Sequence, residues 1–251
     1  MSKVTTRLAN QDIVNIARQQ YENKQRSKLP SIIVELPSKG LIYPESSPLR
    51  EGKLEIRYMT AYDEDILTNS SYIQSGIVFD KLLESIILSP IDINDISAAD
   101  RDALILYSRI VSYGAEYPVV LTDPKTKNQI ERIVDLNKLS NKSFNLVSNS
   151  DGEFEYEFGS NKLKFIYNVR VKDTMTVTDI LNLIIIEING SRSKSDIESF
   201  IRYDFLARDA KQFREYFAKN TPGIDYNYEF EGEDGSTFIT PFPVGPDLFW
   251  F

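Results

Sequence analysis

Apolar side chains recur along the chain at two spacings, and each spacing predicts one kind of element. Apolar positions three and four residues apart predict helices, and strict alternation with polar positions predicts half-buried strands. Stretches rich in Pro, Gly and Asn separate these segments and mark their ends. The predicted helices are Leu8–Lys28, the segment from the Thr60 cap to Leu67, Ile77–Leu88, Ala98–Tyr113, Val177–Ile188, Ser193–Phe205 and Asp209–Lys219. The predicted strands are Ser31–Leu36, Leu54–Tyr58, Tyr117–Thr122, Ile130–Leu136, Phe154–Phe158, Leu163–Val169, Tyr226–Phe230 and Phe238–Phe242.

The segment Val177–Ile188 is compatible with a helix or a strand, because isoleucine-rich runs suit both. Thr178-Asp179 provides a helix start and Asn189-Gly190 a stop, which favours a helix. The start of another helix is clearer. Ser97 is a typical N-cap, and Asp100 lies in the first turn, where an acid complements the helix dipole.

These elements predict an α+β fold in which several antiparallel β-hairpins are inserted between helices. Because strands and helices do not alternate regularly, we expect no doubly wound sheet. We expect three parts: an N-terminal amphipathic helix or arm over residues 1–30, a first α+β domain over 31–145, and a second α+β part over 146–251 that ends in a β-hairpin and an aromatic tail. The polar stretch Asn141–Gly152 is expected to be an exposed connector.

The amino-acid composition excludes several kinds of chemistry. The 251 residues include no cysteine and no histidine, which excludes disulfides, thiol nucleophiles, histidine general bases and the usual Cys/His zinc sites. We therefore expect no cofactor and no metal. The polar start of the chain lacks the apolar region of a signal peptide, and the longest apolar run is too short to span a bilayer. A cytoplasmic location is the expectation that follows.

Charge is distributed unevenly within a net charge of -8. The first 28 residues carry six basic and two acidic side chains, whereas the residues from Thr221 onward carry six acids and no Lys or Arg. Such asymmetry suits a protein that docks onto others through its ends, although two unrelated solvated faces remain the alternative. The acidic balance argues against nucleic acid and anionic membranes as partners.

No segment presents a recognisable catalytic constellation. Ser38-Lys39-Gly40 has the residues of a phosphate-binding loop in the wrong order, so a turn is the better interpretation. Asp63, Glu64 and Asp65 lie at a predicted helix start, where acids complement the dipole. No particular pair of carboxylates suggests hydrolysis, and a carboxylate-based hydrolase is kept only as a rival hypothesis. We predict no enzyme activity and no catalytic residue.

The last four residues, Leu248-Phe249-Trp250-Phe251, are unusually apolar for a chain end. Burying each large apolar side chain is worth roughly 1.5–3 kcal/mol, so we expect them to be covered. Two alternatives remain open. The tail could fold back as a clamp on its own hairpin, or it could insert into a groove on a partner, as aromatic anchors do.

Several short stretches occur in a familiar order. They are Leu36-Pro37-Ser38-Lys39-Gly40, Ile56-Arg57-Tyr58-Met59-Thr60 with Asp63-Glu64, the segment Arg109–Tyr117, and the end from Phe213-Arg214-Glu215-Tyr216 through Pro243-Val244-Gly245 to Phe249-Trp250. In this order they resemble T-even-like phage baseplate hub and hub-assembly (tail assembly chaperone) proteins. The resemblance covers roughly two thirds of the chain, from about Leu36 on. In some of those proteins the hairpins look like cysteine-bearing zinc-ribbon knuckles. Glu231, Gly232 and Gly235 occupy that region here, so we expect packing to hold the hairpins.

The resemblance implies a non-catalytic assembly factor or minor structural component of a contractile phage tail baseplate hub. Its expected partners are other hub and tail proteins, met in the host cytoplasm during assembly, and an oligomer or hetero-complex is compatible with this role. A subunit retained in the virion tail baseplate is the alternative to a transient chaperone. The motifs identify neither the partner nor the stoichiometry. The residues expected to contact partners are Ile13 and Tyr21 in the first helix, Pro37, Gly40 and Tyr43 in the following loop, and Leu248, Phe249, Trp250 and Phe251 in the tail.

Overall fold

The computed structural model describes residues 28–169, 171, 174–242 and 246–249. The chain divides into two compact units: unit 1 contains Met1–Val34 and Leu54–Pro90, and unit 2 contains Glu35–Lys53 and Ile91–Phe251. The predicted helix over residues 8–28, with Ile13 and Tyr21, lies outside the described residues except for its last position. The compact units differ from the predicted three-part division, because the loop after the first strand packs with the later part of the chain.

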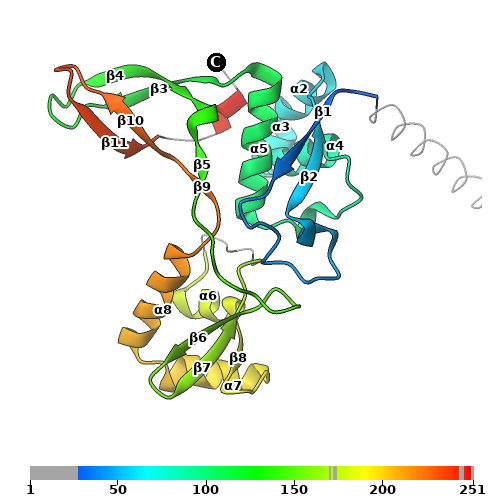
Figure 1. The fold of residues 1–251 in the computed structure, drawn as a ribbon, viewed down its shortest axis with the longest axis vertical. Helices are drawn as coiled ribbons and strands as arrows, with labels where there is room; N and C mark the ends of the chain where they lie inside the picture. The colour runs from blue at the N-terminus through cyan, green and yellow to red at the C-terminus, as the bar shows by residue number, and fades with distance from the viewer. Residues whose placement is uncertain (1–27, 170, 172–173, 243–245, 250–251) are drawn as a thin grey trace, which may run out of the picture. The chain divides into compact units, whose positions relative to one another are not determined.

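Unit 1 combines a two-stranded sheet with short helices (Figure 1). The two strands run antiparallel, since Tyr58 N donates to Pro30 O at one end and Leu36 N donates to Gly52 O at the other. Each strand extends by one residue into unit 2. The elements are β1 (Ser31–Glu35), β2 (Lys53–Arg57), α2 (Ala61–Leu67), α3 (Ser70–Gln74) and α4 (Val78–Ile86).

The core of unit 1 lies where α4 meets β2. Leu82 and Ile86 of α4 are fully buried together with Ile56 of β2. After α4 the chain returns alongside β2, with Leu88 N donating to Glu55 O at 2.9 Å. The predicted helices and strands among the described residues of this unit are confirmed, with ends that differ by one or two residues, whereas α3 was not predicted.

Unit 2 contains the long helix α5 and several antiparallel strand pairs. The pairs are β3–β4, β5–β9, β10–β11 and the three-stranded sheet β6–β7–β8, which confirms the predicted α+β class. The helices are α5 (Ala98–Tyr113), α6 (Val177–Ile184), α7 (Lys194–Ser199) and α8 (Ala207–Lys219), with short 3-10 helices at Pro48–Glu51, Ile93–Asp95, Leu136–Lys138 and Pro246–Phe249, and a π-helical turn at Phe200–Asp204. The strands are β3 (Glu116–Thr122), β4 (Gln129–Asp135), β5 (Ser140–Asn141), β6 (Phe154–Phe158), β7 (Asn161–Phe165), β8 (Ile185–Ile188), β9 (Ile224–Asp225), β10 (Asn227–Glu231) and β11 (Thr237–Pro241).

The isoleucine-rich segment resolves into both of its possible elements. Its first part is the helix α6, as predicted, but Ile185–Ile188 forms the strand β8, so the helix prediction is wrong there. Ile188 pairs with Leu163 and Ile185 with Phe165, all four buried. The β-branched side chains complete the sheet core, and tertiary pairing therefore overrides the local helix signal.

Aromatic side chains hold the three-stranded sheet against α8. Phe165 on β7 and Phe213 on α8 are both fully buried, with ring centroids 5.4 Å apart. Tyr156 on β6 lies 4.8 Å from the ring of Tyr216 on α8. Phe144 also joins this core at 1% exposure, so the predicted connector Asn141–Gly152 is exposed only in part.

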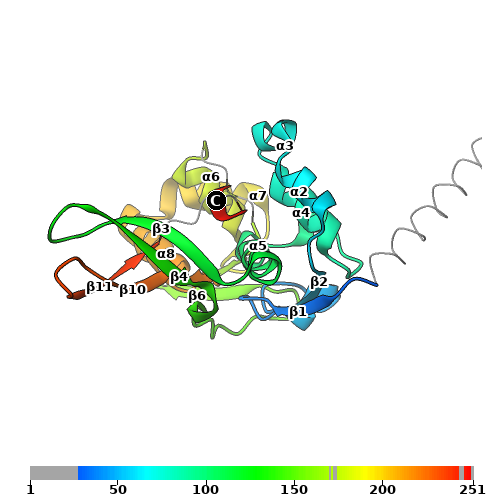
Figure 2. The ribbon, with the colours of Figure 1, turned by 90° about the horizontal axis from the view of Figure 1, so that it is seen from above.

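The hairpins β3–β4 and β10–β11 lie side by side in both views (Figures 1 and 2). Their tips meet at Asp123, whose carboxyl accepts hydrogen bonds from the backbone N–H groups of Lys125, Thr126 and Glu233 at 2.8–3.1 Å. These N–H groups, that of Glu233 foremost, hold the pKa of Asp123 below its ordinary value. Lys125 also pairs with Asp234 at 2.8 Å. One carboxylate thus joins the two tips in the region compared above with zinc-ribbon knuckles.

Replacing Asp123 by Asn should loosen the two hairpin tips. The amide can accept on one side only, so at least one buried N–H loses its acceptor. Asp135→Asn is the matched control, because Asp135 accepts a single N–H, from Asn137, and Asn caps as well as Asp. We expect faster hydrogen exchange of residues 123–128 and 231–236 in Asp123→Asn and unchanged exchange there in Asp135→Asn. Equal hydrogen exchange in the two variants would argue that the Asp123 carboxylate does not hold the two hairpin tips together.

Candidate functional site

A tight loop over residues 36–52 forms the first part of the candidate site. Its two arms touch at Gly40 (φ +77°) and Gly52 (φ +70°). A Cβ on Gly40 would lie 2.2 Å from the carbonyl oxygen of Arg50, so only glycine allows this approach. The Arg50 guanidinium donates to the carbonyl of Tyr43 at 2.8 Å, which closes the loop from the other side.

A buried carboxylate ties this loop to the start of α5. Asp100 is fully buried and accepts from Ser38 N at 3.0 Å, from Tyr43 Oη at 2.6 Å and from Ser97 Oγ at 3.0 Å. Ser97 N in turn donates to Tyr43 Oη at 2.9 Å. The predicted Ser97 cap is confirmed, since Ser97 Oγ accepts from Asp100 N. The interpretation of Asp100 as a dipole-complementing acid is incomplete, because its carboxyl also organises a loop more than fifty residues earlier.

Burial dominates the electrostatics of this network. Withdrawal from water raises the pKa of Asp100 above its ordinary value. Burial, together with the neighbouring Asp100, raises the pKa of Tyr43 as well. Within the described part of the chain no Lys or Arg forms an ion pair with Asp100. The network therefore works through hydrogen bonds and geometry.

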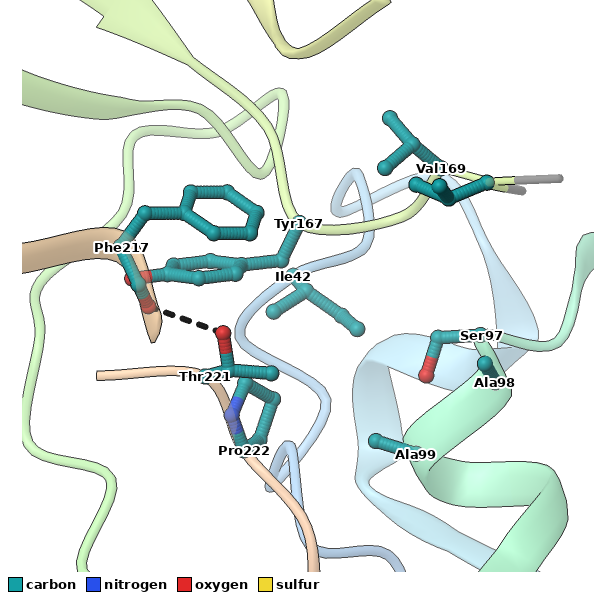
Figure 3. A pocket seen from close by; sticks show the side chains of 10 residues that line it. Ile42, Ser97, Ala98, Ala99, Tyr167, Val169, Phe217, Thr221 and Pro222 are labelled. Atoms are coloured by element: carbon teal, nitrogen blue, oxygen red, sulfur yellow. Dashed lines mark hydrogen bonds between the residues drawn. The ribbon is translucent and has the colours of Figure 1, made fainter. Parts of the chain in front are cut away.

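An apolar groove of about 230 Å³ opens beside Ser97 of this network. Figure 3 shows the side chains that line the groove. Ile42 from the loop and Ser97 at the α5 cap belong to its wall, so the buried carboxylate positions part of the lining. The lining residues are Ile42, Ser97, Ala98, Ala99, Tyr167, Val169, Val171, Phe217, Thr221 and Pro222.

The opposite wall is an aromatic pair. The rings of Tyr167, after β7, and Phe217, on α8, stack with centroids 4.5 Å apart and planes 27° apart. Thr221 Oγ1 donates to the carbonyl of Phe217 at 2.8 Å, drawn as the dashed line in Figure 3. This bond holds the chain beyond α8 against the groove.

The lining is suited to burying an apolar side chain. The three hydroxyl groups of the described lining are already engaged: Ser97 donates to Asp100, Thr221 donates to the carbonyl of Phe217, and Tyr167 donates to the same carbonyl at 3.4 Å. Among the described lining residues Tyr167 alone is ionisable, and burial raises its pKa. The groove is smaller than the roughly 300–1,000 Å³ of most pockets for drug-sized ligands. Its size and apolar lining suit one large apolar side chain.

The loop residues predicted to contact partners lie inside the loop. Pro37, Gly40 and Tyr43 are buried, and they shape the loop from within. Lys39 and Pro44 are its exposed neighbours. A partner contact through this loop stays a prediction.

The two described residues of the apolar tail are buried against unit 2. Leu248 is 2% and Phe249 4% exposed, so this part of the tail folds back onto its own chain, and the contacts given next lie on α5 rather than on the predicted hairpin. The Phe249 ring packs edge-on against Tyr113 at 6.2 Å, and Leu248 O accepts from Arg109 Nε at 2.8 Å. Trp250 and Phe251 lie outside the described residues, so any contact they make with a partner stays a prediction.

Arg109 explains a second motif of the resemblance. Its guanidinium is fully buried and also donates to the carbonyls of Gly114 at 2.7 Å and Glu116 at 3.2 Å. The motif from Arg109 to Tyr117 therefore ends α5, starts β3 and anchors the tail segment. Its described role is architectural.

The motif around Arg57 and Asp63 is a buried ion pair in unit 1. Arg57 Nη1 and Nη2 donate to the two Asp63 oxygens at 2.7 and 2.9 Å, and Ser85 Oγ donates to Asp63 at 2.7 Å. Thr60 N also donates to Asp63 at 2.7 Å, which forms a capping box at the predicted Thr60 cap. Burial alone raises the pKa of Asp63, but the bonds from Arg57, Ser85 and Thr60 outweigh it and hold the pKa below its ordinary value. The helix-dipole interpretation of Asp63 missed this buried partner.

Other kinds of site find little support in the part of the chain that the structure describes. Across those residues, no group of three or more acidic side chains is placed to hold a metal ion. No described helix is both long enough and apolar enough to cross a membrane.

The fold and the groove together define an α+β protein with a recessed apolar surface. The comparisons give its family. The model of the family described as "T4 bacteriophage base plate protein" matches residues 29–238, which is most of the chain. The chain therefore belongs to the T4 bacteriophage base plate protein family. The comparison with curated proteins found no match. The comparison with solved structures found none either.

Family membership gives the protein a structural or assembly role in the phage tail baseplate. The sequence had suggested this family through motifs whose central side chains the structure shows to be buried. The groove was missed, because its lining comes from four separate segments whose individual residues carry no distinguishing sequence signal.

Proposed function

We propose that this chain is a non-catalytic assembly factor of the phage tail baseplate hub, and that it works by holding another baseplate protein through the unit 2 groove. Support comes from the family and from the groove lining, which offers apolar surface and engaged hydroxyl groups. Large apolar side chains seated in such pockets dominate many protein interfaces. The proposal goes beyond family membership in two respects: it locates the chain at the hub, and it makes the chain a transient chaperone.

The groove is stiffened before any partner arrives. Tyr43, Ser97 and Asp100 fix the wall that carries Ile42, and the bond from Thr221 fixes the wall that carries Phe217. A rigid pocket loses little conformational entropy on binding, which favours affinity from a small contact. This pre-organisation supports binding as the mechanism.

Ala98→Glu tests the groove. Ala98 is exposed, lines the groove and is the first residue of α5, where an acidic residue complements the dipole and leaves folding intact. Ala207→Glu is the matched control, since Ala207 is the exposed first residue of α8 and is not part of the lining. In infected cells carrying a tagged chain, we expect Ala98→Glu to recover baseplate proteins at least about tenfold less well than wild type. Ala207→Glu should behave as wild type.

Equal recovery by wild type and both variants would show that the groove is not the docking site. Mass spectrometry of assembly intermediates and finished particles separates the two assembly roles. A chain present in intermediates and absent from particles is the expected result for a transient factor. A chain found in both at the same ratio to other baseplate proteins is a retained structural subunit.

A further inference from the structure

The outer face of the β3–β4 hairpin carries an exposed apolar stripe. Val120 is 55% and Ile133 64% exposed, and Pro118 is exposed beside them. Pro118 pairs directly with Ile133 across the hairpin, and Val120 pairs with Glu131 one step further along. Diagonal neighbours on one face of a hairpin lie within side-chain reach, so the three apolar residues form a continuous surface.

This stripe is bordered by acids. Glu116 and Asp135 pair at one end of the hairpin, and Glu131 lies opposite Val120. The described strands place no Lys or Arg on this face, because Arg132 alternates to the other face and donates to Glu231 O at 2.8 Å. The surface therefore suits a segment that combines apolar side chains with basic ones.

The chain itself contains such a segment. Residues 8–28 have helical periodicity, with Ile13, Ala17 and Tyr21 spaced four residues apart on one face. Arg18 and Lys24 each lie three residues from Tyr21, next to that face. The first 28 residues carry most of their charge as Lys and Arg, whereas the rest of the chain is more acidic than the net charge of -8 suggests.

We propose that the outer face of β3–β4 binds residues 8–28 of a second copy of this chain. Each contact is small, since three apolar side chains cover far less than the roughly 1,200–2,000 Å² of a stable interface. If each copy places its residues 8–28 on the hairpin of the other copy, the same contact forms twice around a two-fold axis. Once the first contact has joined the two copies, the second forms within the pair and no longer depends on the protein concentration. The protein therefore forms a reciprocal homodimer, a property separate from its binding of baseplate partners.

A charge swap on the full-length chain tests the proposal. The hairpin variant Glu116→Lys/Glu131→Lys and the segment variant Arg18→Glu/Lys24→Glu should each dimerise on the order of tenfold more weakly than wild type in analytical ultracentrifugation. An equimolar mixture of the two should form a heterodimer of near wild-type affinity, because each basic hairpin meets an acidic segment and each acidic hairpin meets a basic segment. Unchanged thermal unfolding of each variant shows that folding is intact.

The matched control is Glu229→Lys/Glu231→Lys. It makes the same charge change on the outer face of β10–β11, where Ile239 is 71% exposed. This variant should dimerise as wild type does. A wild-type chain that stays monomeric across the concentration range overturns the proposal. So does a control variant as weak as the hairpin variant, or a mixture that does not regain affinity.

Discussion

Replacing Asp63 by Asn is expected to destabilise unit 1 by about 3–5 kcal/mol, the usual cost of removing one partner from a buried ion pair. Asp63 is fully buried and accepts both Nη atoms of Arg57, which is itself 3% exposed. An amide cannot neutralise the guanidinium, and its NH2 group opposes one donor. Hydrogen exchange of residues 54–90 measures the loss in unit 1 apart from unit 2.

Two further variants separate charge from packing. Asp65→Asn is the matched control, because Asp65 is exposed on the same helix and should cost less than about 0.5 kcal/mol. The double variant Arg57→Met/Asp63→Leu should be clearly more stable than Asp63→Asn alone, since it removes both charges together. A double variant that is less stable than the single one would mean that the hydrogen bonds to Thr60 and Ser85, not charge pairing, dominate.

The same pair predicts a pH dependence. The pKa of Asp63 is held below its ordinary value of 3.8, so its stabilising contribution is present above that pH and is lost as the pH falls through the lowered value. The gap in stability between wild type and Asp63→Asn should therefore be largest near neutral pH and should shrink below about pH 4. A gap that stays constant down to pH 2 would contradict the ion-pair account.

The sequence predicted the elements well, because caps and periodicity are local signals. The Thr60 and Ser97 helix starts and the hairpin turns after Thr122 and Phe158 lie where expected. Within Val177–Ile188 the helix ends and a strand begins at Ile185, because the residues from Ile185 on pair with β7, which is a tertiary interaction. Spacing and capping patterns depend on neighbouring residues, so they do not report a partner strand about twenty residues away.

Burial of polar residues was the main feature that the sequence did not give. Asp63 and Asp100 both sit at helix starts, where an exposed acid is the ordinary expectation, yet both are fully buried. Arg109 likewise carries no sign in the sequence that it reaches Leu248 O, 139 positions later. Whether a polar side chain is buried depends on the residues around it in the folded structure, and a single sequence does not show which residues these are.

These buried groups explain why the motifs suggested a family but not its contacts. Arg57, Asp63, Asp100 and Arg109 each fix a loop, a helix start or a tail segment. The surfaces proposed to bind partners, the groove and the outer face of β3–β4, consist mainly of residues outside those motifs. The motif residues stabilise the fold, whereas apolar residues outside the motifs form the surfaces proposed to bind partners.

Gly40→Ala is expected to be among the most damaging single substitutions in unit 2, at a cost on the order of 4 kcal/mol or more. A Cβ there would lie 2.2 Å from Arg50 O and 2.8 Å from Gly52 N, and both are backbone atoms that cannot rotate away. Gly235→Ala is the matched control, because Gly235 has φ +78° against +77° for Gly40 and no atom within 4 Å of its would-be Cβ. The control therefore measures only the cost of placing Ala in a left-handed backbone conformation, which we expect to lower the stability by about 1–2 kcal/mol.

The damage from Gly40→Ala should spread from the loop to the groove. Pushing the two arms of the loop apart moves Ser38 and Tyr43 away from Asp100, and a buried carboxylate that loses these donors has no other partner among the described residues than Ser97. Hydrogen exchange should rise in residues 36–52 and at the start of α5, and recovery of baseplate proteins should fall as in Ala98→Glu. If Gly40→Ala destabilises the loop while recovery stays at the level of Gly235→Ala, partners bind elsewhere, and the loop serves the fold alone.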